Sequence, residues 1–218
     1  IVFERLYAQG KEVAAHADLS DKDQSIYVPK IRTTAADKET MTNHLEAKSA
    51  ATIVDTVSYS SLLPGKEYTL TGTLMNKETG KAIEVGGKRI TASKTFTPTE
   101  ANGTVDVTFT FDASALEGTT IVAFEKLLYK DVEVAVHADI TDKKQTIYIP
   151  KIRTTAISAD TKDHVTMAGE KITLVDTVTF ESLEIGRTYK VSGVLMDRDT
   201  NKPVQVGGKN VTSSLTFT

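Results

Sequence analysis

The sequence lacks cysteine and tryptophan altogether, and aromatic residues make up only 6% of its 218 residues. Without cysteine the chain forms no disulfide, although it is long enough for one or two domains with a real core. The net charge of −3 provides no basic surface for nucleic acid or anionic lipid. No apolar run approaches the roughly 18 residues of a membrane span, and no signal peptide is visible. We therefore expect no nucleic acid partner and no membrane contact in this segment.

What the sequence does contain is an internal repeat. The segment "IYVPKIRTTA" recurs as "IYIPKIRTTA", and "VGGKRITASKTFT" recurs as "VGGKNVTSSLTFT". Each match lies at an offset of 121 residues, which is the separation of Gln24 from Gln145. The repeat predicts the C-terminal part of one unit, one complete unit and the N-terminal part of a third, over residues 1–29, 30–150 and 151–218. We interpret the chain as an excerpt of a longer array.

Local patterns indicate an all-β fold. Segments such as "TVDVTFTF" and "QTIYI" are rich in β-branched and aromatic residues, and turn sequences such as "LPGKE" and "EANGT" separate them. Several short strands in roughly 120 residues favour tandem immunoglobulin-like antiparallel β-sandwich domains. Because only "PKI" joins successive units, we expect the array to be a stiff rod.

Strand alternation places polar side chains in the core. In "QTIYI", Gln145 shares a face with two isoleucines, and in "IRTTA" Thr33 lies on the apolar face while Thr34 points outward. Asp55 in "IVDTV" and Glu125 in "VAFE" also lie among apolar residues. Since buried polar groups are unfavourable without partners, we expect these side chains to satisfy one another, with a histidine nearby.

Together these residues resemble the motif of a known family. The Thr of "IRTTA", the Asp of "VDTV", the Glu of "VAFE" and a His eight residues before the closing Gln are similar to the repeat domains of Gram-positive surface adhesins that form a spontaneous Thr–Gln ester bond. The resemblance covers the complete repeat and both partial ones. It implies that Thr33 is the nucleophile and that Gln145 supplies the electrophilic carbonyl. It also implies assisting catalytic roles for His137, Asp55 and Glu125.

The partial repeats carry this motif in two halves. By the resemblance, its members there are Glu4, His16, Gln24, Thr154 and Asp176. Two alternatives remain open in the complete repeat. Thr34 is adjacent to Thr33, and only alternation separates the two hydroxyls. Asp142, which recurs as Asp21, is the second candidate for the acidic role.

The residue types suit the chemistry that the resemblance implies. A neutral His137 can take the proton of the Thr33 hydroxyl and later protonate the leaving ammonia. A close Asp55–Glu125 pair in a dry site is expected to share a proton, and a protonated carboxyl can donate to the Gln145 oxygen. The event occurs once per domain. We therefore expect single-turnover self-modification rather than an enzyme, with no cofactor and no metal.

The resemblance implies a structural stalk repeat of an extracellular, cell-wall-anchored adhesin, locked by an ester between its first and last strands. Its partners would be adjacent repeats of the same protein, and a host receptor would be met by a tip domain outside these residues. The alternative is an immunoglobulin-like adhesin module that itself binds a host ligand. The absence of tryptophan disfavours stacking on sugars.

Other chemistries find little support in the sequence. An isopeptide bond would need an asparagine on a terminal strand, and the closing segment from Val132 to Pro150 has none. The segment "VGGK" lies between strands and does not open a helix, so it is a turn rather than a phosphate loop. His44 and His164 do not align at the repeat offset and form no ligand cluster. Acidic turns such as "DLSDKD" lack the EF-hand pattern.

Overall fold

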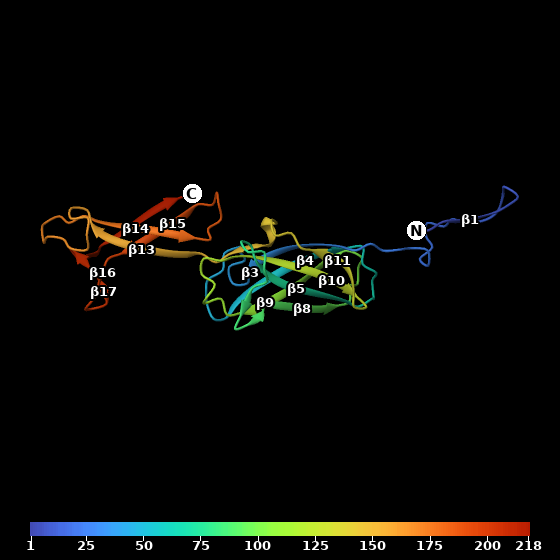
Figure 1. Cartoon of the computed structure of the whole chain (residues 1–218), viewed down its shortest axis with the longest axis horizontal. Helices are drawn as coiled ribbons and strands as arrows, with labels where there is room; N and C mark the ends of the chain where they lie inside the picture. The colour runs from blue at the N-terminus through green and yellow to red at the C-terminus, as the bar shows by residue number, and fades with distance from the viewer. The chain divides into compact units, whose positions relative to one another are not determined.

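The structure is a computed structural model that describes every residue from Ile1 to Thr218. It is built of antiparallel strands with a single short 3₁₀ turn, which confirms the all-β prediction (Figure 1). The chain divides into two compact units, Ile1–Pro150 and Lys151–Thr218. No helix is long and apolar enough to cross a membrane.

The complete repeat is a sandwich of two antiparallel sheets (Figure 1). In the first sheet the strand order is β3 (Lys30–Asp37), β4 (Ala51–Ser60) and β9 (Gly103–Phe111). In the second it is β11 (Val132–His137), β10 (Thr120–Tyr129), β5 (Tyr68–Asn76) and β8 (Thr91–Phe96). The short β12 (Thr146–Tyr148) pairs with the beginning of β10, and β6 (Glu84–Val85) forms a hairpin with β7 (Lys88–Arg89).

The two sheets share one hydrophobic core. Strand β3 and the first seven residues of β4 alternate between buried and more exposed residues, as a period of two requires. Their inward side chains meet those of the second sheet, among them Leu70, Leu74 and Leu127, none of which is exposed. Each such side chain contributes about 1.5–3 kcal/mol through removal from water. This core is the environment into which the polar residues of the motif are brought.

The structure corrects one detail of the alternation argument. Gln145 does not begin a strand; it ends the 3₁₀ turn η1 (Lys143–Gln145), and β12 begins at Thr146. Asp142 caps this turn by accepting a hydrogen bond from the backbone N–H of Lys144. Because the turn interrupts the pleat, Gln145 and Thr146 are both fully buried, although a strand would send them to opposite faces.

The N-terminal segment, residues 1–29, reproduces the hairpin of β10 and β11. Strands β1 (Glu4–Ala8) and β2 (Lys11–His16) pair Glu4 with His16, as β10 and β11 pair Glu125 with His137. Both hairpins have a register shift at the equivalent place, two residues after the glutamate. Every residue of β1 and β2 is exposed.

The C-terminal segment, residues 151–218, reproduces the strands at the start of the complete repeat. Strand β13 (Lys151–Ser158) pairs with β14 (Leu174–Glu181), and β15 (Tyr189–Val194) pairs with β20 (Thr212–Phe217). Between these lie the short pairs β16 (Met196–Asp197) with β17 (Lys202–Pro203) and β18 (Gln205–Val206) with β19 (Lys209–Asn210). The register repeats that of β3 with β4, because Ala156 faces Asp176 as Ala35 faces Asp55.

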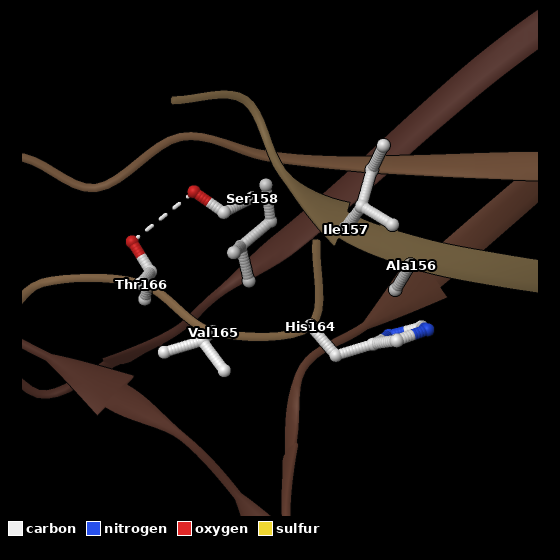
Figure 2. A pocket seen from close by; sticks show the side chains of 7 residues that line it. Ala156, Ile157, Ser158, His164, Val165 and Thr166 are labelled. Atoms are coloured by element: carbon white, nitrogen blue, oxygen red, sulfur yellow. Dashed lines mark hydrogen bonds between the residues drawn. The ribbon is translucent and has the colours of Figure 1, made fainter. Parts of the chain in front are cut away.

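A pocket in the C-terminal segment lies where the complete repeat holds its last strand. Figure 2 shows the side chains of Ala156, Ile157, Ser158, His164, Val165 and Thr166 around it. In the complete repeat the corresponding segment includes Asn43 and Leu45, whose backbone groups bond to those of Tyr148 at 2.8 and 2.9 Å. The His44 ring also stacks on Tyr148. The pocket is thus the counterpart of the groove that β12 occupies.

Candidate functional site

Thr33 and Gln145 meet in the core of the complete repeat. Thr33 points inward from β3 with 3% of its surface exposed, and Gln145 is fully buried. The amide Nε2 of Gln145 donates a hydrogen bond to Thr33 Oγ1, across 112 residues of sequence. Thr34, the alternative hydroxyl, lies on the exposed face of β3. The structure therefore brings the expected nucleophile, and not its neighbour, to the glutamine amide.

Asp55 and Glu125 enter the same core from opposite sheets. Asp55 lies on β4, Glu125 lies on β10, and both are fully buried. Burial, reinforced by the negative charge of Asp55, raises the pKa of Glu125 to about 9. Burial raises the pKa of Asp55 to about 6, against the opposing influence of Thr33, Glu125 and His137. At neutral pH the pair thus retains one proton.

The lack of hydrogen-bond donors around this pair supports a shared proton. None of the four carboxylate oxygens of Asp55 and Glu125 has a hydrogen-bond partner, and neither has Oε1 of Gln145. Two ionised carboxylates offer only acceptors, whereas a protonated carboxyl adds one O–H donor. A proton shared by the pair therefore supplies the donor that the buried oxygens of this site lack.

His137 lies at the end of β11, directly opposite Glu125 in the strand ladder. Its Nε2 is 2.9 Å from Oδ2 of Asp142, and only 11% of the histidine side chain is exposed. Asp142, the second candidate for the acidic role, is thus the partner of the histidine, and Asp55 is the carboxylate that meets Glu125. A carboxylate on one ring nitrogen leaves the other nitrogen available for proton transfer.

Gly72 is a component of the site that the motif did not identify. It lies on β5 opposite Glu125 on β10. A Cβ atom at this position would collide with Oε1 of Glu125 and with Cζ of Phe109, so that only glycine leaves room for the carboxyl group. The available signal was a glycine inside a strand pattern, which often marks a close approach, repeated at the 121-residue offset as Gly193.

Each partial repeat carries one half of the same site. In the N-terminal segment Gln24 Nε2 donates to Oε2 of Glu4 at 2.8 Å and lies 3.2 Å from Nδ1 of His16. His16 Nε2 is 3.0 Å from Oδ2 of Asp21. In the C-terminal segment Thr154 and Asp176 lie on the paired strands β13 and β14, and both are exposed.

Comparison with known proteins identifies the family of this chain. The family model described as the T-Q ester bond containing domain matches residues 1–28, 29–149 and 150–218. The chain therefore belongs to this family, which confirms the resemblance found in its motifs. No curated protein matches the sequence.

Among solved structures, the fold is similar to a bacterial adhesin from Mobiluncus mulieris that contains intramolecular disulfide, isopeptide and ester bond cross-links. In one crystal form the match has a TM-score of 0.50 at 16% identity and covers 86% of this chain and 97% of the adhesin. In a second crystal form it has a TM-score of 0.47 at 16% identity and covers 86% of this chain and 93% of the adhesin. At this level of identity the likeness concerns the fold.

Proposed function

We propose that residues 30–150 form a stalk repeat of a bacterial cell-surface adhesin, locked by an intramolecular ester between Thr33 and Gln145. The observation that carries the proposal is the contact of Gln145 Nε2 with Thr33 Oγ1 beside the buried Asp55–Glu125 pair. Membership of the T-Q ester bond family supports the same chemistry.

The reaction is an acyl transfer from nitrogen to oxygen. His137 accepts the proton of the Thr33 hydroxyl, and Thr33 Oγ1 attacks Cδ of Gln145. The protonated carboxyl of Glu125 donates to Gln145 Oε1, where negative charge develops in the tetrahedral intermediate. The bond between Cδ and Nε2 then breaks, and the amide nitrogen leaves as ammonia with the proton that His137 returns. The products are one ester and one ammonia, so the domain reacts once and is not an enzyme.

Burial serves both the formation and the survival of the bond. Because the two groups are held in contact, the reaction avoids the cost of a bimolecular encounter. Because Thr33, Asp55, Glu125 and Gln145 are all buried, little water reaches the ester to hydrolyse it.

The position of the bond suits a load-bearing module. Thr33 lies on β3 at the start of the repeat, and Gln145 immediately precedes β12 at its end. An ester between them carries tension past the rest of the fold. It also closes a loop of about 110 residues, which is worth roughly 4–5 kcal/mol by the loop-entropy argument for cross-links. In a chain without cysteine it replaces a disulfide with a bond that reductants do not break.

The biological setting follows from this role. We place the protein outside the cell, on a bacterial surface and anchored to the cell wall, with adjacent repeats of the same protein as its neighbours. Contact with a host receptor would be made by a tip domain outside these residues.

Intact-mass spectrometry tests the proposal. The 218-residue chain should weigh about 17 Da less than its sequence predicts, because one ammonia is lost for each ester formed. Proteolysis should yield one branched product that joins the peptide of Thr33 to the peptide of Gln145. Thr33→Ala should abolish the loss, while Thr34→Ala, the matched control on the exposed face, should retain it. A folded wild-type chain of full mass would overturn the proposal.

A further inference from the structure

A hydroxyl group follows the closing glutamine in both copies of the motif, and it makes the same bond in each. Thr146 Oγ1 donates to the backbone carbonyl of Asp142 at 2.8 Å. Ser25 Oγ donates to the backbone carbonyl of Asp21 at 2.8 Å. The surroundings differ, because Thr146 is fully buried in the sandwich while Ser25 lies in the N-terminal segment outside it. The bond therefore belongs to the local segment and does not depend on the sandwich.

In the complete repeat this hydroxyl has a second partner. Thr146 Oγ1 also accepts a hydrogen bond from Nζ of Lys77, at 3.0 Å. Lys77 follows directly after β5, and its counterpart at the repeat offset is Arg198, another cation. The Lys77 ammonium donates its hydrogen bond to Thr146 Oγ1. The hydroxyl hydrogen of Thr146 therefore donates to the backbone carbonyl of Asp142. A valine would fill the same volume in the core, so the hydroxyl itself needs an explanation.

The residue held by this hydroxyl is the partner of the histidine. Thr146 fixes the carbonyl of Asp142, and the carboxylate of Asp142 lies 2.9 Å from His137 Nε2. In the N-terminal segment, where Asp21 occupies Nε2 of His16, the other nitrogen Nδ1 lies 3.2 Å from the amide nitrogen of Gln24. With the aspartate on Nε2, the other ring nitrogen of His16 thus faces the glutamine amide nitrogen.

We propose that Thr146 is a positioning residue for ester formation: its hydroxyl, oriented by Lys77, holds Asp142 so that His137 is fixed in the geometry for proton transfer. The inference rests on the proposed Thr33–Gln145 reaction. Thr146 touches none of the reacting atoms through its side chain and acts through Asp142. Small displacements of a group that transfers protons are costly, about 100-fold in rate for 1 Å.

The rate of ammonia loss tests this inference. The full 218-residue chain is translated in vitro, and intact mass gives the fraction of chains that have lost ammonia as a function of time. Thr146→Val should slow the loss by about 10- to 100-fold. Thr146→Ser should restore a rate close to wild type, because serine makes the same bond at position 25. Thr108→Val, on the exposed face of β9, is the control for the exchange and should not change the rate.

A double-mutant cycle separates positioning from a general effect on the fold. If Thr146 acts through Asp142, the double variant Thr146→Val with Asp142→Asn should react no more slowly than Asp142→Asn alone. Independent, multiplicative effects, or a wild-type rate for Thr146→Val, would overturn the inference. The melting temperature of Thr146→Val in a Thr33→Ala background measures any loss of folding. If that variant does not fold, Lys77→Met replaces it, and an unchanged rate for Lys77→Met would then overturn the inference.

The outcomes distinguish this inference from the proposed function. A wild-type chain that never loses ammonia contradicts the proposed ester. A wild-type chain that loses ammonia, with Thr146→Val equally fast, leaves the ester in place and removes only the role of Thr146.

Discussion

The same three residue types meet twice in this chain, once in the core of the complete repeat and once in the N-terminal segment. Glutamate and histidine are paired through the same strand register in both places, the glutamine follows the histidine by eight residues, and each histidine contacts an aspartate five residues later. The histidine side chain is 59% exposed in the N-terminal segment and 11% exposed in the complete repeat. Local sequence therefore builds the arrangement, and the sandwich adds burial.

The two segments differ in the partner of the glutamine amide nitrogen. In the N-terminal segment the amide nitrogen of Gln24 donates to Glu4. In the complete repeat the amide nitrogen of Gln145 instead donates to Thr33, in a core that also buries the Asp55–Glu125 pair. The complete repeat thus adds Thr33, Asp55 and a core without water to the arrangement of the N-terminal segment. Substitutions can test the contribution of each.

Removing the proton donor should have the largest effect. Glu125→Gln keeps the size of the side chain but cannot give up a proton, so ester formation should fall by about 100- to 1,000-fold, as for loss of an oxyanion donor. Intact mass should then show nearly the whole population at full mass. Glu133→Gln, on the exposed face of β11, is the matched control and should react as wild type. Equal reaction of Glu125→Gln and wild type would show that another group polarises the amide.

Filling the space beside Glu125 should have the next largest effect on ester formation. Gly72→Ala places a methyl group on Glu125 and Phe109, so the carboxyl group must move and most ester formation should be lost. Gly193→Ala makes the same exchange in the C-terminal segment, where a Cβ atom meets nothing within 4 Å. This control should lose ammonia as wild type does. If Gly72→Ala also reacts at the wild-type rate, the position of Glu125 is less restrictive than the packing implies.

Gly72 also marks the limit of what the sequence predicts. Alternation within regular strands placed Thr33 and Asp55 correctly, because a period of two decides the face. It reached Gln145 through an expected strand that is in fact the end of a 3₁₀ turn, so it gave the right burial there but the wrong element. The partners of Gly72 and Asp142 depend on contacts between distant strands and on turn geometry, neither of which a periodic pattern encodes.

The buried pair should also make the unlinked fold sensitive to pH. In the folded chain the pKa values of Asp55 and Glu125 are raised from 3.8 to about 6 and from 4.5 to about 9, and Thr33→Ala makes their effect measurable by preventing the ester. Since the folded state binds these protons more tightly than the unfolded state, their contribution to stability is complete below about pH 4. It is lost as the pH rises through about 6 and then about 9. Urea midpoints at pH 5 and pH 9.5 should show this decline.

The matched variant for the pH experiment is Thr33→Ala with Glu125→Gln. It removes the group that titrates highest, so the part of the decline between about pH 6 and pH 9 should disappear. If both chains lose stability equally over that range, other groups cause the pH dependence and Glu125 is ionised in the folded state.

The smallest effect is expected for cross-linking between molecules, in which the N-terminal segment of one chain would combine with the C-terminal segment of another. The N-terminal segment carries Glu4, His16 and Gln24, and the C-terminal segment carries Thr154 and Asp176, so joining Thr154 to Gln24 would need both segments in one sandwich. The N-terminal segment supplies counterparts of most of β10 and of β11 and β12, and the C-terminal segment supplies those of β3 to β8. Neither supplies a counterpart of β9.

The missing strand is an edge strand, yet it forms one wall of the site. In the complete repeat β9 pairs along the whole of β4, and its Phe109 is buried beside Gly72 and Glu125. A composite without it would leave the counterparts of the carboxyl pair open to water, where an amide is not activated. We therefore expect a single monomer band on a reducing, denaturing gel, unchanged in Thr154→Ala. A ladder of multimers that survives reductant and collapses in Thr154→Ala would instead show that local arrangement suffices and that the wall formed by β9 is dispensable.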